Sequence, residues 1–161
     1  MAIIHLTYVI NAPIERVFDL SRSIDLHTIS TKRSNEKAIA GVVKGLINLN
    51  ETVTWQAFHL FKQRMFTSKI TAFERPFYFK DEMQKGDFKK FSHDHFFKAL
   101  DGKTEMFDKI ILESPYGIIG KIITYLFLKN YITTFLKERN ETIKEYAETE
   151  KWRTILIDTN G

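Results

Sequence analysis

The sequence predicts an α+β protein that forms a single domain over residues 1–161, in which an antiparallel sheet packs against one long helix near the C-terminus. Two patterns of apolar spacing favour this class. Between Glu51 and Glu113 the apolar residues recur with a period of two, which is typical of strands, and after Ser114 they recur with the helical period of about 3.6. A chain of 161 residues that is 43% hydrophobic can bury a core, and the absence of cysteine excludes disulfides.

The first fifty residues predict one strand, two short helical segments and an irregular connection. Ile3–Ile10 is rich in β-branched and apolar residues, which favours a strand. Asn11 as a cap and Pro13 at the first helical position then indicate the start of a short helix. Ser21–Ser34 is expected to form a second short helix or a loop. Two glycines interrupt Lys37–Asn50, which indicates an irregular connection around a weak strand.

Five further strand-like runs follow and form an antiparallel meander. Short separators divide them, and the most informative separator is Asp101-Gly102, because Asp-Gly favours the type I′ turn that joins two antiparallel strands. The five runs are Glu51–Leu60, Met65–Phe73, Phe77–Gln84, Phe88–Leu100 and Lys103–Glu113.

The last predicted element is one long amphipathic helix. Apolar residues recur at helical spacing from Ile118 to about Glu150, and some thirty residues at 1.5 Å each span roughly 45 Å. Such a helix crosses a whole sheet. A twisted sheet that curls around a single helix cannot close everywhere, so the space between them is a natural place for a pocket.

Composition and charge exclude several classes of function. The chain has a formal net charge of +4, but its basic residues alternate with acidic ones and no RNA-binding motif accompanies the local group of Lys85, Lys89 and Lys90, so we expect no nucleic-acid partner. The longest apolar stretch, Tyr116–Leu128, is interrupted by Lys121 and is shorter than the ~20 residues that span a bilayer, so no stable membrane insertion is expected. The first residues lack the pattern of a signal peptide, which makes a cytoplasmic location the expectation.

The alternation of side chains assigns two faces to each strand. A two-residue turn at Asp101-Gly102 pairs Leu100 with Lys103, and this register places His95 opposite Asp108 on the inward face. Both apolar and polar side chains fall on that face. The predicted apolar wall of a cavity is Trp55, Phe66, Phe79, Met83, Phe91, Phe97 and Met106, and the predicted polar patch within it is His59, Asp81, His93, His95 and Asp108.

Three interpretations of the inward polar patch stay open, because buried charges must be paired, hydrated or functional. His95 and Asp108 could form a satisfied pair with buried water, or the patch could orient a ligand. His95 and Asp108 could also act as an acid–base pair, although no second catalytic partner is evident. His93 and His95 together with Asp81, Asp108 or His59 could supply three metal ligands, but more specific metal motifs are absent, so we predict no metal and no cofactor.

Six segments in this order along the chain carry a resemblance to a known family: Ile10–Phe18, Thr52–Trp55, Asp81–Met83, His93–Phe97, Ser114–Gly117 and Arg139-Asn140. They resemble the START/Bet v 1-like (SRPBCC) superfamily, and within it a bacterial ligand-binding branch often labelled cell-division inhibitor. The resemblance covers nearly the whole chain. It implies the helix-grip fold, in which a seven-stranded antiparallel sheet curls around a long C-terminal helix and a hydrophobic cavity lies between them. Members of the superfamily bind lipids, sterols, polyketides or hormones, and some are cyclases or hydrolases, but no shared catalytic set transfers to this chain.

The sequence therefore predicts a protein that binds a small hydrophobic or amphipathic molecule, of lipid, polyketide or aromatic type, between its sheet and its C-terminal helix. Two alternatives stay open. One is a cyclase or hydrolase that uses His95 and Asp108 in the same cavity. The other is an interaction protein, such as a homodimer, that docks through Phe96 and Phe107, which the register places side by side on the outer face, unless the stems of neighbouring lysines cover them.

Overall fold

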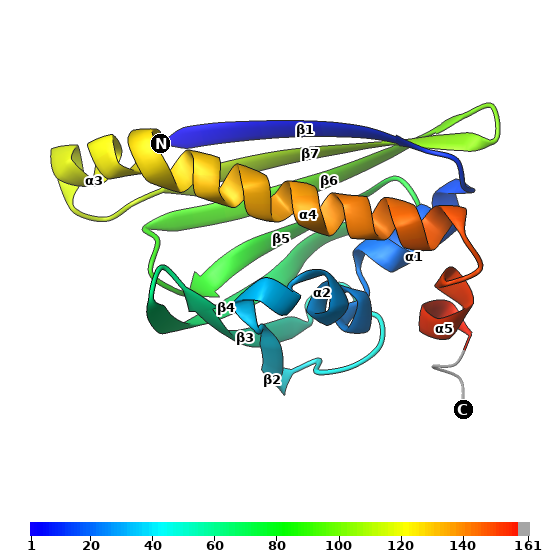
Figure 1. Cartoon of the computed structure of the whole chain (residues 1–161), viewed down its shortest axis with the longest axis horizontal. Coiled ribbons are helices and arrows are strands. Elements are labelled where there is room, and N and C mark those ends of the chain that lie inside the picture. The colour runs from blue at the N-terminus through cyan, green and yellow to red at the C-terminus, as the bar shows by residue number, and fades with distance from the viewer. Residues whose placement is uncertain (158–161) are drawn as a thin grey trace.

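The computed structural model describes residues 1–157, and within them one antiparallel sheet of seven strands curls around a long helix (Figure 1). The strands follow one another in space as β1-β7-β6-β5-β4-β3-β2, so β1 and β2 are the two edges. This architecture confirms the predicted α+β helix-grip fold. The strands are β1 (Ala2–Ile10), β2 (Lys37–Gly41), β3 (Thr52–His59), β4 (Lys62–Glu74), β5 (Tyr78–Lys85), β6 (Lys90–Leu100) and β7 (Lys103–Glu113).

Two short helices, α1 (Ile14–Ser21) and α2 (Ile24–Ser30), follow β1 as predicted, with a 3₁₀ turn at Lys32–Ser34. The predicted cap is wrong. Pro13 occupies the N-cap position of α1, and the backbone N–H of Asn11 instead donates to Glu148 Oε1 at 2.8 Å. Asn11 therefore joins the end of β1 to the far end of the C-terminal helix.

The turn between β6 and β7 confirms the predicted register. Asp101 and Gly102 have φ values of 44° and 78°, and both values are positive as a type I′ turn requires. Leu100 pairs with Lys103, and this register continues along both strands to His95 opposite Asp108.

A bulge in β4 changes the predicted faces at one end of that strand. The register against β5 shifts between Ile70 and Ala72, and one extra residue reverses the alternation beyond it. Alternation alone places Ala72 on the inward face. The structure instead brings Phe73 inward, where its ring meets Phe18 edge-on at 5.4 Å between centroids.

The C-terminal helix is continuous from α3 (Gly117–Ile123) through a π-helical turn (Thr124–Leu128) to α4 (Lys129–Glu148), and a short α5 (Trp152–Leu156) that the sequence analysis missed follows it. Gly120 lies where the helix passes the preceding loop. A Cβ atom there would be 1.9 Å from the carbonyl oxygen of Pro115, so only glycine allows this close approach. None of the helices among residues 1–157 is both long and apolar enough to cross a membrane.

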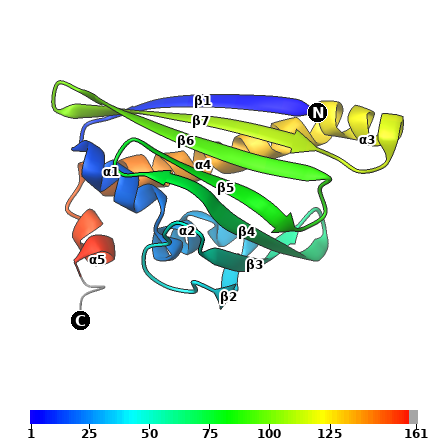
Figure 2. The same cartoon turned by 180° about the vertical axis from the view of Figure 1, so that it is seen from behind.

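All of the helices lie on one face of the sheet, as the view from behind shows (Figure 2). Two groups of buried residues stabilise this packing. One surrounds Phe18 of α1, whose ring contacts Phe79 and Phe97 edge-on. The other joins β1 and β7 to Leu136 of α4. Because α1 covers only one end of the sheet, the two groups leave a space between the sheet and α4.

Candidate functional site

A cavity of about 360 Å³ lies between the concave face of the sheet and the helices. Strands β3 to β6 supply one wall, and α2, the loop before α3 and α4 supply the other. Phe79 belongs to the core around Phe18 and Leu136 to the core under α4, so the cavity touches both groups. Eight of the twelve predicted site residues line it: Trp55, His59, Phe66, Phe79, Asp81, Phe91, His93 and His95.

The other four predicted residues lie away from the cavity, and each has a packing reason. Phe97 and Met106 lie under α1, where Phe97 contacts the Phe18 ring at 5.2 Å between centroids. Met83 packs beneath the turn after β5, close to Gly86. Asp108 is only 1% exposed, behind the two histidines of β6. These four side chains are therefore not part of the lining of this cavity.

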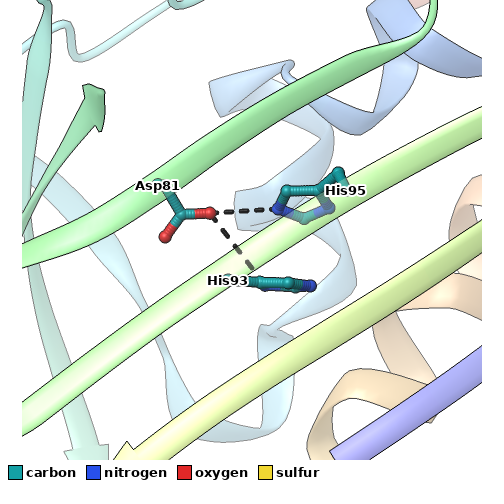
Figure 3. Close-up of side chains that lie close together, drawn as sticks. All are labelled: Asp81, His93 and His95. Carbon is teal, nitrogen blue, oxygen red and sulfur yellow. Dashed lines mark hydrogen bonds and ion pairs between the residues drawn. The ribbon is translucent and has the colours of Figure 1, made fainter. Parts of the chain in front are cut away.

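Four of the predicted polar side chains form one group, here called the Asp81 cluster: Asp81, His93, His95 and Asp108. Figure 3 shows the first three of them. The register places Asp81 opposite His93 and His95 opposite Asp108, so three adjacent strands supply the group. His93 Nε2 lies 2.9 Å from Asp108 Oδ1, and His95 Nε2 lies 3.0 Å from Asp81 Oδ2. His95 Nδ1 lies 2.8 Å from Asp108 Oδ1 but makes no hydrogen bond, because the oxygen is outside the direction that its N–H requires.

Helix α4 closes the Asp81 cluster from the other side. Asn140 Nδ2 donates to the second oxygen of Asp108 at 2.6 Å. Arg139 Nη1 donates to Asn140 Oδ1 at 3.2 Å, and Arg139 Nη2 donates to the backbone oxygen of Ser21 at 2.6 Å. One chain of hydrogen bonds therefore joins β7, α4 and the end of α1.

The pKa values in the Asp81 cluster are shifted by burial and by the neighbouring charges. Burial raises the pKa of Asp108, but the adjacent His93 and His95 outweigh burial and hold this pKa well below its usual range. Burial lowers the pKa of His95, but Asp108 and Asp81 outweigh it and raise this pKa. Burial and the neighbouring His95 lower the pKa of His93. The raised pKa of His95 favours its charged form, which together with Arg139 compensates the two carboxylates.

A second polar group, here called the Glu36 cluster, lines the same cavity: His27, Glu36, His59 and Tyr131. Glu36 Oε2 lies 2.6 Å from His27 Nε2, and Glu36 Oε1 lies 2.8 Å from His59 Nε2. The other ring nitrogen of His59 lies 2.7 Å from the hydroxyl of Tyr131. Burial raises the pKa of Glu36, but the hydrogen bonds to the two histidines outweigh burial and lower this pKa to about 2.

Sequence reasoning found His59 but missed His27, Glu36 and Arg139. Glu36 lies between the 3₁₀ turn and β2, where no periodicity assigns a direction to a side chain, and His27 lies in α2, which the sequence left as a short helix or a loop. Arg139 had a usable signal. With Asn140 it interrupts the spacing from Leu136 to Ile143 on the buried face of α4, and a charged residue at such a position indicates a buried partner.

The outer face carries the aromatic pair that the register predicted. The Phe96 and Phe107 centroids are 5.8 Å apart, and Phe107 also packs against His5. Phe96 is 40% exposed, whereas Phe107 is partly covered. The pair is thus a small patch, and a homodimer through it stays a prediction.

Comparisons with known proteins identify the fold. No protein-family profile matches the chain, and no curated protein does. Among solved structures, TTHA0849 from Thermus thermophilus is 18% identical with a TM-score of 0.68, over 88% of this chain and 97% of that one. A START superfamily protein from Mycobacterium smegmatis is 12% identical with a TM-score of 0.69, over 91% and 97% of the two chains. Ginseng major latex-like protein 151 from Panax ginseng is 11% identical with a TM-score of 0.64, over 92% and 98%. The chain therefore has the fold of the START/Bet v 1-like (SRPBCC) superfamily, as its sequence predicted.

The ionised Glu36 predicts a specific dependence of stability on pH. Its pKa falls from 4.5 in the unfolded chain to about 2 in the folded one, which corresponds to about 3 kcal/mol of stabilisation. Because the folded pKa is the lower one, this stabilisation is present above about pH 4.5 and is lost as the pH falls towards about 2. Urea unfolding of wild type and Glu36→Gln measures it.

We expect the free-energy difference between wild type and Glu36→Gln to be large at about pH 5 and to shrink at about pH 2.5. Glu150→Gln, whose side chain is 81% exposed, is the matched control and follows the wild type at both values. An equal difference between wild type and Glu36→Gln at both pH values would contradict the hydrogen bonds assigned to the Glu36 carboxylate.

Proposed function

We propose that the protein binds one small amphipathic molecule in the cavity, with the apolar part against the aromatic wall and the polar end beside the Asp81 cluster. The observation that carries this proposal is the contrast within one cavity. Trp55, Phe66 and Phe91 form an apolar wall, and two hydrogen-bonded clusters place polar side chains beside it. The volume of about 360 Å³ falls in the range of about 300–1,000 Å³ that is usual for small-molecule sites.

The exposure of the polar groups supports this orientation of the ligand. Within the Asp81 cluster, the side chain of Asp81 is 20% exposed, whereas those of His95 and Asp108 are 2% and 1% exposed. Asp81 is therefore the member that a ligand can contact. Fixed polar groups in an otherwise apolar pocket set the orientation of a bound molecule, because leaving them without partners is costly.

The same geometry argues against acid–base chemistry by His95 and Asp108. A general base must reach the proton that it removes, at hydrogen-bond distance or through one water. Each ring nitrogen of His95 lies within 3.0 Å of a carboxylate oxygen, and Asp108 does not line the cavity. We therefore assign this pair to holding Asp81 and the sheet in place.

Filling the cavity tests the proposed function. Ala57 is buried on its wall, and Ala99 lies exposed on β6. We expect Ala57→Phe to weaken binding of the amphipathic fluorophore 8-anilinonaphthalene-1-sulfonate by about tenfold or more, because the new ring occupies the space. Overpacking costs typically 1–3 kcal/mol, so near-ultraviolet circular dichroism must show that the variant remains folded.

Ala99→Phe is the matched control, since it adds the same ring outside the cavity, and its affinity for the fluorophore should equal that of the wild type. Equal affinities for the two phenylalanine variants would place the fluorophore outside the cavity and overturn the proposal. Native mass spectrometry of the purified protein is a second measurement, in which a bound small molecule is expected with wild type and lost with Ala57→Phe.

A further inference from the structure

Three side chains of the Asp81 cluster present metal-ligating atoms to one another (Figure 3). His95 Nε2 lies 3.0 Å and His93 Nδ1 lies 3.9 Å from Asp81 Oδ2, and the three ligand atoms all lie within 4.8 Å of one another. Ligands bound to one tetrahedral ion at about 2.0–2.2 Å lie roughly 3.3–3.6 Å apart. The two distances from Asp81 fall on either side of that value, so small side-chain shifts would accommodate an ion.

Asp108 has the position of an outer carboxylate in a metal site, which contacts the histidine ligands and not the ion itself. Metal-bound histidines usually direct their second ring nitrogen to a carboxylate, which fixes the ring orientation and the tautomer. Here His93 Nε2 and His95 Nδ1 lie 2.9 Å and 2.8 Å from the same oxygen, Asp108 Oδ1. Asn140 binds the other oxygen of Asp108. His95 Nδ1 is buried and makes no hydrogen bond, and a modest turn of the ring would let it donate to Asp108.

We propose that Asp81, His93 and His95 bind a divalent transition-metal ion such as Zn²⁺, with Asp108 as the outer carboxylate that orients both imidazoles. All three ligands line the cavity, so the remaining coordination position faces the bound molecule. The charges of Asp81, Asp108 and Arg139 sum to one negative charge. A bound divalent ion turns this sum into one positive charge. The open position therefore favours an anionic group, such as a carboxylate or hydroxide.

Titration with metal tests this site. Tag-free protein freed of metal with a chelator is titrated with Zn²⁺ by calorimetry, and we expect one ion per chain with micromolar affinity or tighter. Asp81→Asn and His93→Gln should each weaken binding by about 100-fold or more. Asp108→Asn should weaken it by about 10–100-fold, because it removes only the outer partner.

His59→Gln is the matched control, since His59 lines the same cavity within the Glu36 cluster, and it should leave the affinity for Zn²⁺ unchanged. If His93→Gln fails to fold, Asp81→Asn and the visible spectrum of the Co²⁺-loaded protein give the same answer. Millimolar Zn²⁺ affinity in wild type would overturn the metal site, and so would equal weakening by His59→Gln and Asp81→Asn. The Asp81 cluster would then be a group of hydrogen-bonded carboxylates and histidines without a metal.

A different feature, the exposed surface at one end of the molecule, carries a second inference. The helix from α3 through the π-helical turn exposes large apolar side chains, which soluble surfaces rarely gather in one place. The turn between β3 and β4 adds Phe61, which is 96% exposed. The exposed apolar residues on the helix and just before it are Tyr116, Ile118, Ile119, Ile122, Ile123, Tyr125, Leu126 and Phe127. We call these eight residues and Phe61 the apolar end.

The apolar end surrounds one side of the cavity. Figures 1 and 2 both place α3 and the β3–β4 turn at the same end of the molecule. Tyr116 just before α3, Ile123 of α3 and Leu60 of the turn also line the cavity. A membrane or protein surface bound to the apolar end would therefore lie beside the cavity, at an entry route for an apolar molecule.

The charges at this end indicate what covers it. Residues 114–137 contain Lys121, Lys129 and Lys137 and no acidic residue. Lys121 is exposed among the apolar side chains, and the N-terminal amine and Lys89 lie close enough to Glu113 to lower its pKa together with Lys121. Apolar helices with lysines at their margin adsorb to anionic lipid, because burial of apolar area adds to charge attraction.

We infer that the apolar end adsorbs reversibly to an anionic membrane surface, so that the cavity exchanges its ligand with the lipid; the exchange rests on the function proposed above. Flotation with vesicles measures adsorption directly. Wild type should bind vesicles of phosphatidylcholine with about one third phosphatidylglycerol more tightly than vesicles of phosphatidylcholine alone. Ile119→Glu should weaken this binding by about tenfold or more.

Phe96→Glu is the matched control, because it places the same charge at an exposed aromatic on the outer face, and it should bind vesicles as wild type does. Binding of the fluorophore in the cavity should be unchanged in Ile119→Glu, which separates failure of this inference from failure of the proposed function. Absence of vesicle binding, or a dimer in sedimentation that Ile119→Glu dissociates, would overturn it and assign the apolar end to a second copy of the chain.

Discussion

Burial of the Asp108 carboxylate is the constraint on which the rest of this structure depends. A carboxylate that is 1% exposed must be fully partnered, since breaking a buried ion pair costs about 3–5 kcal/mol. Two histidines of β6 and Asn140 of α4 supply the partners, and Arg139 extends the chain of hydrogen bonds to the end of α1. The long helix is thereby held at one position over the sheet by polar contacts as well as by apolar packing.

This polar anchor and the core around Phe18 together determine where space remains. Phe18 and its aromatic neighbours fill the end of the sheet under α1, and Leu136 packs α4 against β1 and β7. The cavity lies beside them, and it is lined by Asp81, His93 and His95 and by the Glu36 cluster. Polar groups that stabilise the fold therefore also form the polar part of the cavity. A substitution in either cluster is expected to change stability and binding together, so controls for folding are essential.

Much of the fold followed from local rules. Alternation and the Asp101-Gly102 turn gave the pairing of β6 with β7, and helical spacing gave the long C-terminal helix, because both depend on neighbours in sequence. The candidate site followed only in part. Alternation does not show which end of a strand a distant helix covers, so Phe97 and Met106 were placed in the cavity although α1 buries them. Alternation also assigns no direction to side chains in turns, so the sequence did not predict Glu36 as a site residue. The expectations of a cytoplasmic location and of no nucleic-acid partner stay predictions.

The central claim is that a small molecule occupies the cavity beside Trp55. The chain has two tryptophans, and Trp152 of α5 does not line the cavity, so the two indole N–H signals in a ¹H–¹⁵N spectrum report on the two places separately. Addition of 8-anilinonaphthalene-1-sulfonate should shift the Trp55 signal in a saturable way and leave the Trp152 signal in place. Saturable binding with an unmoved Trp55 signal would contradict the account.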